Sequence, residues 1–250
     1  MKANVFTDER MYALLQTSKL KSRRISLAGG VLYLTTFILV PSFILYAPLR
    51  DPNYMTVPGP DGGAVFGGIL EIIVALAGIG TAVVLYPVLK RQNQVLALGF
   101  IGSRIVEACT MFAGIVCLLT MVSLHRSGAG AEAQITGRAL INMYDWFHLG
   151  QTIMPAINDA LLGYLLYRSG LEPRILPLLG LIGAPFLFAN AIVLMFGITG
   201  PVLTLTTLAV IPIALFEFAL GVYLAVKGFK PTRLIAEFEK METNRPVSAE

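Results

Sequence analysis

Charged side chains are scarce in this sequence. Asp, Glu, Lys and Arg make up 14% of its 250 residues, whereas hydrophobic residues make up 56%. Soluble domains carry about 25% charged residues. The mean hydropathy of +0.73 is also much more apolar than that of a soluble domain. The composition therefore excludes an ordinary soluble domain and predicts an integral membrane protein.

Cysteine and histidine are also rare. The two cysteines, Cys109 and Cys117, are eight residues apart, about 12 Å along a helix, so they cannot form a disulfide with each other. His125 is expected in an external loop, which leaves His148 without a second histidine for paired haem ligation. No lysine lies inside an apolar segment, which excludes a retinal Schiff base, and the chain has no phosphate loop or nucleophile elbow. We expect no cofactor.

Long apolar segments are abundant instead. A transmembrane helix needs about 20 mostly apolar residues. The predicted spans are residues 26–47, 64–88, 95–123, 140–166, 175–198 and 202–226, with an interruption of the first span at Pro41. The predicted fold class is an all-α polytopic membrane protein, a six-transmembrane-helix bundle with short interfacial helices at both termini.

The chain divides into three regions by composition. The predicted regions are a cytoplasmic N-terminal segment, 1–24, with an interfacial helix over 7–24; the six-span domain, 25–228; and a cytoplasmic amphipathic tail, 229–250. The first 24 residues are polar and basic and lack the pattern of a cleavable signal, so the first span is expected to act as a signal anchor. In the tail, Leu234, Ile235, Phe238 and Met241 recur at helical spacing.

Basic residues are distributed unevenly between the two sides of the predicted bundle. Most of the 19 Lys and Arg residues lie in the N-terminal segment, the second and fourth connections and the tail, whereas Arg50, Arg126 and Arg138 lie on the other side. The positive-inside rule then predicts a protein of the cell (cytoplasmic) membrane with both termini in the cytoplasm. The lipid bilayer is the expected partner; the charge pattern follows topology and does not indicate nucleic acid.

Polar residues inside the spans are the candidate site residues, because an ionisable group in a membrane is costly and usually functional. They are Glu71, Arg104, Glu107, Asp145, His148, Gln151, Asn158, Asp159 and Glu217. Asp145, His148 and Asp159 fall within about 80° on one helix face. Arg104 and Glu107, three residues apart, also share a face.

The charge balance of this set indicates its function. Five carboxylates facing one guanidinium would leave about four negative charges unpaired, and burial of even one is prohibitive. Most of the acids must be protonated, hydrated or bound to a cation. The sequence therefore favours a binding or transport site for protons, cations, or a small cationic or amphiphilic ligand, and the spread of acids through the membrane favours a pathway or elongated pocket.

Two other functions fit the same residues. His148, Asp145 and Glu107 could act on a lipid-like substrate as an intramembrane enzyme, although the balance leans against an enzyme. The carboxyls could also be neutral groups that only join helices. A metal site at Asp145, His148 and Asp159 is disfavoured because such sites generally need more than one His or Cys ligand, and we expect none.

Several short motifs carry a family resemblance. They are Arg104-x-x-Glu107, Asn158-Asp159 ahead of Gly163-Tyr164, Tyr167-Arg168-Ser169 leading to Pro173-Arg174, and Phe216-Glu217. Over about residues 20 to 230 the chain resembles a bacterial family of six-span integral membrane proteins known only as a domain of unknown function. The resemblance implies topology and polar positions but no chemistry. No internal repeat is evident, although a homodimer could supply one.

Overall fold

The computed structural model describes residues 2–57, 59, 61–198 and 202–243, and these form helices joined by turns. The α-helices are α1 (Lys2–Thr36), α2 (Leu39–Leu45), α3 (Gly62–Leu89), α4 (Gln94–Arg126), α5 (Gln134–Ser169), α6 (Ile175–Met195), α7 (Val202–Val226) and α8 (Arg233–Thr243). Two 3-10 helices, η1 (Ala47–Arg50) and η2 (Gly130–Ala133), lie in the connections. The described part of the chain contains no strand, so the all-α prediction is confirmed.

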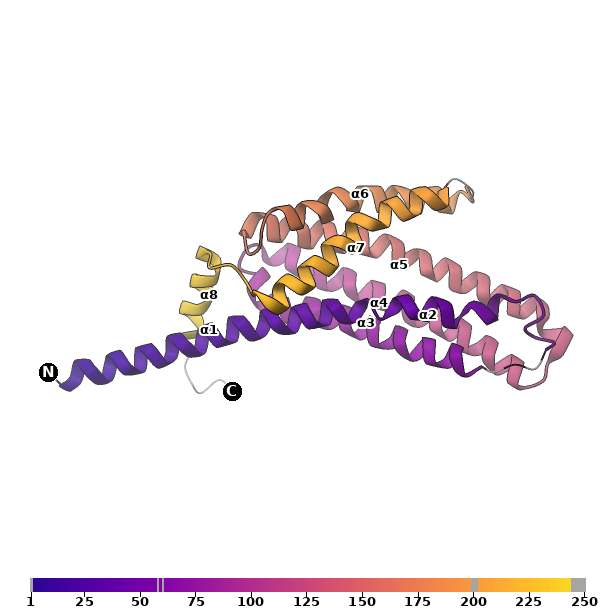
Figure 1. Cartoon of the computed structure of the whole chain (residues 1–250), viewed down its shortest axis with the longest axis horizontal. Coiled ribbons are helices and arrows are strands. Elements are labelled where there is room, and N and C mark those ends of the chain that lie inside the picture. Colours follow the sequence, from indigo (N-terminus) through magenta and orange to yellow (C-terminus); the bar gives the residue numbers. More distant parts are fainter. Residues whose placement is uncertain (1, 58, 60, 199–201, 244–250) are drawn as a thin grey trace.

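The six long helices close a ring. In chain order α3 packs on α4, α4 on α5, α5 on α6 and α6 on α7, and α1 closes the ring by packing on both α7 and α3. Figure 1 shows the turns gathered at two opposite ends: the N-terminal part of α1 and α8 lie at one end, and the η1 region lies at the other. Side chains that point into the ring from different helices can therefore meet.

Five helices are long and apolar enough to cross a membrane, within the described residues. They are Gln16–Ser42, Gly62–Leu89, Gln94–Arg126, Ile175–Met195 and Leu208–Val226. They correspond to five of the six predicted spans. The predicted fourth span lies in α5, which has the length but not the apolar composition, because it carries most of the intramembrane polar residues. The membrane character of the helical bundle is thus confirmed, and α5 is the helix on which the count of six depends.

The first helix differs from the prediction. The segment 7–24 is helical, but it is not a separate interfacial helix: it continues without a break into the first span as α1, and in Figure 1 the N-terminal part of α1 projects beyond the bundle. The break comes only after Thr36, before α2. Pro41 explains its position, because proline cannot bond to the carbonyl of Phe37 four residues earlier and its ring clashes with that carbonyl.

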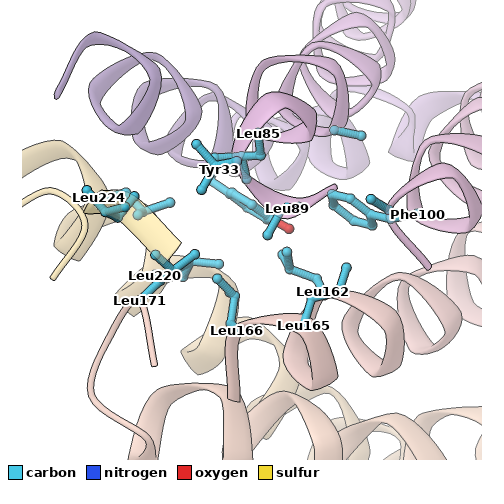
Figure 2. Close-up of a cluster of buried hydrophobic side chains, with 14 of the residues drawn as sticks. Tyr33, Leu85, Leu89, Phe100, Leu162, Leu165, Leu166, Leu171, Leu220 and Leu224 are labelled. Carbon is cyan, nitrogen blue, oxygen red and sulfur yellow. The ribbon is translucent and has the colours of Figure 1, made fainter. Parts of the chain in front are cut away.

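The main core lies in the half of the ring next to α8. Figure 2 shows buried leucines of α3, α5 and α7 packed around Tyr33 and Phe100. Ile235 and Phe238 of α8 belong to the same buried cluster. The amphipathic tail therefore places part of its apolar face on the protein itself. Leu234 is partly buried against this cluster, whereas Met241 is 43% exposed.

Close backbone contact joins α1 to α7 at Gly30. A Cβ atom at Gly30 would lie 2.5 Å from the backbone nitrogen of Ala225 and 2.6 Å from the carbonyl oxygen of Gly221. Small residues permit such approach between membrane helices. This contact holds Tyr33 of α1 and Glu217 of α7 close to the ring interior.

Candidate functional site

A single buried guanidinium organises the middle of the ring. Arg104 of α4 donates through Nη1 to Glu107 Oε2 at 2.9 Å and through Nη2 to Glu217 Oε1 of α7 at 2.8 Å. Nη2 also donates to the hydroxyl oxygen of Tyr33 at 3.2 Å. Arg104 thus ties together α1, α4 and α7, and it neutralises at most one of the two carboxylates that it contacts.

Asn158 of α5 is a further hydrogen-bond partner of Glu107. Asn158 Nδ2 donates to Glu107 Oε2 at 2.7 Å, and the side-chain oxygen of Asn158 accepts from the hydroxyl of Ser103 on α4. Asn158 is completely buried. Its amide orientation is therefore set by one donor and one acceptor, and it keeps Glu107 directed toward Arg104.

Asp159 lies next to Arg104, Glu107 and Glu217 but is not hydrogen-bonded to them. It is completely buried, and neither carboxyl oxygen has a hydrogen-bond partner among the described residues. Glu217, Arg104 and Glu107 are its charged neighbours. A buried carboxylate without a donor is strongly unfavourable. Asp159 must therefore hold a proton or share a positive charge with the cluster.

A cavity of about 180 Å³ opens beside the Arg104 group. Arg104, Glu107 and Glu217 form its charged wall, and Gln151 and Pro155 of α5 also line it. Apart from Thr36 and Gly78, the rest of the lining is apolar: Phe37, Leu39, Val40, Val74, Ala75, Ala108 and Met111. Part of that apolar wall comes from the break between α1 and α2. The cavity is therefore acidic at one side and hydrocarbon-like at the other.

Glu71 belongs to a second polar group on the η1 side of the cavity. It is completely buried; its Oε2 accepts from the Tyr46 hydroxyl at 2.8 Å, and its Oε1 accepts from Gln151 Nε2 at 2.8 Å. Gln151 thus contacts Glu71 and lines the cavity. His148 lies in the same region, with its ring stacked on Tyr144 at a centroid distance of 6.1 Å. Polar side chains therefore extend from Glu71 through Gln151 to the cavity.

Asp145 does not join the buried residues, although the helical stripe places it with His148. Its side chain is 46% exposed, and both of its oxygens accept from Arg50 of η1, at 2.6 and 3.0 Å. The helical period sets only its face; α5 begins at Gln134 and extends past the bundle core, so Asp145 reaches the η1 connection. Asp145 is therefore exposed and paired with Arg50, apart from the buried candidate residues.

The geometry gives little support to an intramembrane enzyme or to a metal site. Asp145 is bonded to Arg50, and Glu107 is bonded to Arg104 and Asn158, so each carboxylate of the proposed catalytic group already has structural partners. Asp145 and Asp159 are separated by about 21 Å along α5. Within the described residues, no group of three or more His, Cys, Asp or Glu side chains could hold a metal ion.

The opposite end from α8 carries a buried ion cluster that the sequence did not reveal. Asp61 accepts from the Tyr54 hydroxyl at 2.5 Å, from His125 Nδ1 at 2.9 Å and from Arg126 Nε at 3.0 Å. Burial would raise the pKa of Asp61, but these three donors outweigh burial and hold the pKa below its usual value. The Nε2 of His125 lies 3.1 Å from the carbonyl oxygen of Val57, so each ring nitrogen lies next to an oxygen atom.

Glu172, in the turn between α5 and α6, is a second buried acid that the sequence did not reveal. Its exposed fraction is 1%, and neither carboxyl oxygen has a hydrogen-bond partner in the described part of the chain. Its position in a short charged turn indicates exposure, so no sequence signal could have identified it. The burial comes from the α7–α8 connection, where the backbone N–H of Lys230 donates to the carbonyl of Leu171 at 2.8 Å.

Comparison with known protein families matches residues 28–228 to the family described as "Domain of unknown function (DUF4386)". The chain belongs to this family. The match begins in α1 and ends just after α7, so it covers the helical ring and the Arg104 group but not α8. No curated protein and no solved structure matches the chain. Membership in the family of unknown function confirms the resemblance seen in the motifs and assigns no activity.

Proposed function

We propose that the cavity beside Arg104 binds a cationic ligand: a proton, a small cation, or the charged head of a cationic amphiphile. Three buried or half-buried carboxyls, Glu107, Asp159 and Glu217, surround one guanidinium. The observation that carries the proposal is the charged wall of the cavity, where Glu107 and Glu217 share the single cation Arg104. Asp159 does not line the cavity, but it adds a third acid next to this group, fully buried and without a hydrogen-bond donor in the described residues. A positive charge in the cavity would offset this excess of carboxylates.

The shape of the cavity supports this ligand class. Its acidic wall suits an ammonium or metal cation, and its apolar wall next to the break between α1 and α2 suits a hydrocarbon chain. Pro155 adds an acceptor, because it has no N–H to bond to the carbonyl of Gln151. The line of polar groups from Glu71 through Gln151 toward Glu107 also provides the steps that transport would need.

Replacement of Glu217 by glutamine is expected to weaken cation binding at least tenfold, about 1.4 kcal/mol, because it removes one of the two negative charges that line the cavity. Binding would be measured on purified protein in lipid nanodiscs by calorimetry, with tetraethylammonium, dodecyltrimethylammonium, Na⁺ and K⁺ as probes. The exposed acid Glu132 in η2 supplies the control, Glu132→Gln, which removes the same charge far from the cavity.

The proton is tested separately, by infrared spectroscopy of the purified protein. A protonated carboxyl has a distinct C=O stretching band, and Asp159→Asn is expected to remove one such band at neutral pH. If no probe cation binds to the native protein and no carboxyl band is lost in Asp159→Asn, the cavity has no cationic ligand and the proposal fails.

The proposal includes a topology of six spans, with both termini in the cytoplasm and α5 as the fourth span. α5 packs between α4 and α6 in the ring, and its Met143, Trp146 and Tyr164 side chains are exposed as lipid-facing residues would be. The excess of Lys and Arg at the α8 end supports a cytoplasmic location for that end.

Cysteine labelling tests this topology. In a Cys109→Ala/Cys117→Ala background, Ser127→Cys at the end of α4 is expected to react with an impermeant maleimide added to intact cells. Gln94→Cys at the start of α4 is expected to react only after the membrane is permeabilised. Both positions are exposed. Labelling of Gln94→Cys in intact cells would show that the start of α4 faces the outside, which is opposite to the proposed orientation.

A further inference from the structure

A second cavity, of about 490 Å³, lies at the α8 end of the molecule between α1, α8 and the connection from α7. It shares no residue with the cavity beside Arg104. Four of its lining residues are basic: Lys19 and Arg23 from α1, Lys227 from the end of α7, and Arg233 from α8. One carboxylate, Glu239, also lines it. The site is therefore strongly cationic.

Two of the charged groups hold the walls of this cavity in place. Arg23 donates to the carbonyl oxygens of Leu224, Ala225 and Val226 at 3.0, 2.7 and 3.1 Å, and so caps the end of α7. Glu239 accepts from the hydroxyl of Ser22 at 2.8 Å, which fastens α8 to α1. These contacts set the positions of the three chain segments before any ligand binds.

The remaining cations have little internal compensation. Lys19 and Lys227 form no ion pair among the residues that the structure describes. Arg233 pairs with Glu237 at 3.2 Å, but its side chain is 93% exposed, and such surface pairs contribute little. Three separate segments thus direct positive charge to one cavity, and an anion there would bridge all three.

We propose that this cavity binds the phosphate headgroup of an anionic phospholipid. In the proposed topology it lies at the cytoplasmic membrane surface, where anionic lipids attract basic residues and where basic pockets beside membrane helices bind lipid headgroups. A bound phosphate fastens α8 to α1 and to the end of α7. The inference rests on that topology and is independent of the cation site.

The test compares two triple variants of equal charge. Lys19→Gln/Lys227→Gln/Arg233→Gln removes three cations from the cavity, whereas Lys90→Gln/Arg168→Gln/Arg174→Gln removes three from the same end of the bundle but outside it. Thermal unfolding in detergent would be followed with added phosphatidylglycerol, phosphatidylcholine or inorganic phosphate. Phosphatidylglycerol is expected to raise the melting temperature of the native protein and of the second variant. The first variant is expected to need at least about ten times more of it.

Three outcomes would overturn the proposal. Equal loss of the phosphatidylglycerol effect in both variants would mean general surface attraction. Equal stabilisation by inorganic phosphate at the same concentration would identify a soluble phosphate ligand instead of a lipid. Equal stabilisation by phosphatidylcholine would show that the negative charge is not recognised. Glu217→Gln should retain the full lipid effect, which separates this inference from the cation site.

The native protein supplies a test that does not depend on folding of the variants. Trypsin is expected to cut after Arg233, at the exposed start of α8, and phosphatidylglycerol should slow this cleavage several-fold more than phosphatidylcholine does. Cleavage after Arg168, an exposed residue in the last turn of α5, serves as the internal reference. Identical cleavage rates after Arg233 with the two lipids would refute headgroup binding.

Discussion

Replacement of Arg104 by alanine is expected to lower the free energy of unfolding by about 3 to 5 kcal/mol, the range typical when one partner of a buried ion pair is removed. The change would leave Glu107 and Glu217 without their shared cation, beside Asp159, which has no hydrogen-bond donor among the described residues. Unfolding by added sodium dodecyl sulfate in mixed micelles, followed by circular dichroism, would measure the loss.

Two further variants identify the cause of that loss. Arg104→Lys keeps the charge but cannot donate to two carboxylates and Tyr33 from a planar fork, so a smaller loss is expected. Arg104→Ala combined with Glu107→Gln and Glu217→Gln should recover much of the stability, because no unpaired carboxylate remains at those positions. An Arg104→Ala protein with native stability would show that the guanidinium does not hold the network together.

Glu172→Gln is expected to stabilise the protein above neutral pH and to flatten its dependence on pH. Burial raises the pKa of Glu172 from 4.5 to about 8, and Lys230 opposes the rise only in part. The folded state therefore favours the protonated carboxyl. Its contribution to stability is complete below pH 4.5, where the unfolded chain is also protonated, and it is lost as pH rises through about 8.

The size of this effect follows from the shift. Each pKa unit corresponds to about 1.4 kcal/mol, so the native protein should lose stability of the order of 5 kcal/mol across this range, and Glu172→Gln should not. Unfolding measured from pH 4.5 to 9 tests the difference. Glu132→Gln, at an exposed position, should follow the native curve. A native protein whose stability is constant over this range would contradict the burial of an unpaired Glu172.

Several features of the fold were predictable because they depend on single segments. Apolar length predicted the five helices that are long and apolar enough to cross a membrane. The interruption near Pro41 is also local, since proline removes one specific backbone hydrogen bond. The apolar spacing of residues 234–241 predicted an amphipathic helix, which is α8. None of these predictions requires knowledge of which helices touch.

The continuity of α1 was not predictable in the same way. A basic segment before an apolar one suggested a helix on the membrane surface followed by a span, but nothing between Arg24 and Gly30 ends a helix. The packing of α8 against α1, with Phe238 in the main core and Glu239 bonded to Ser22, gives the N-terminal part of α1 a protein surface to follow. Tertiary contact therefore decided the course of this segment.

For the polar residues, the sequence determined some properties and the tertiary structure determined the others. The amino-acid sequence by itself determined that the chain enters a membrane, which side chains must avoid lipid, and that acids outnumber bases among them. Only the tertiary structure decided that Arg104 pairs with Glu107 and Glu217, that Glu71 bonds to Tyr46 and Gln151, that Asp145 bonds to Arg50, and that Glu172 is buried. The helical period specifies the face of one helix. The rotation and axial offset between helices depend on side-chain packing, such as the close contact at Gly30, and these offsets determine which charges meet.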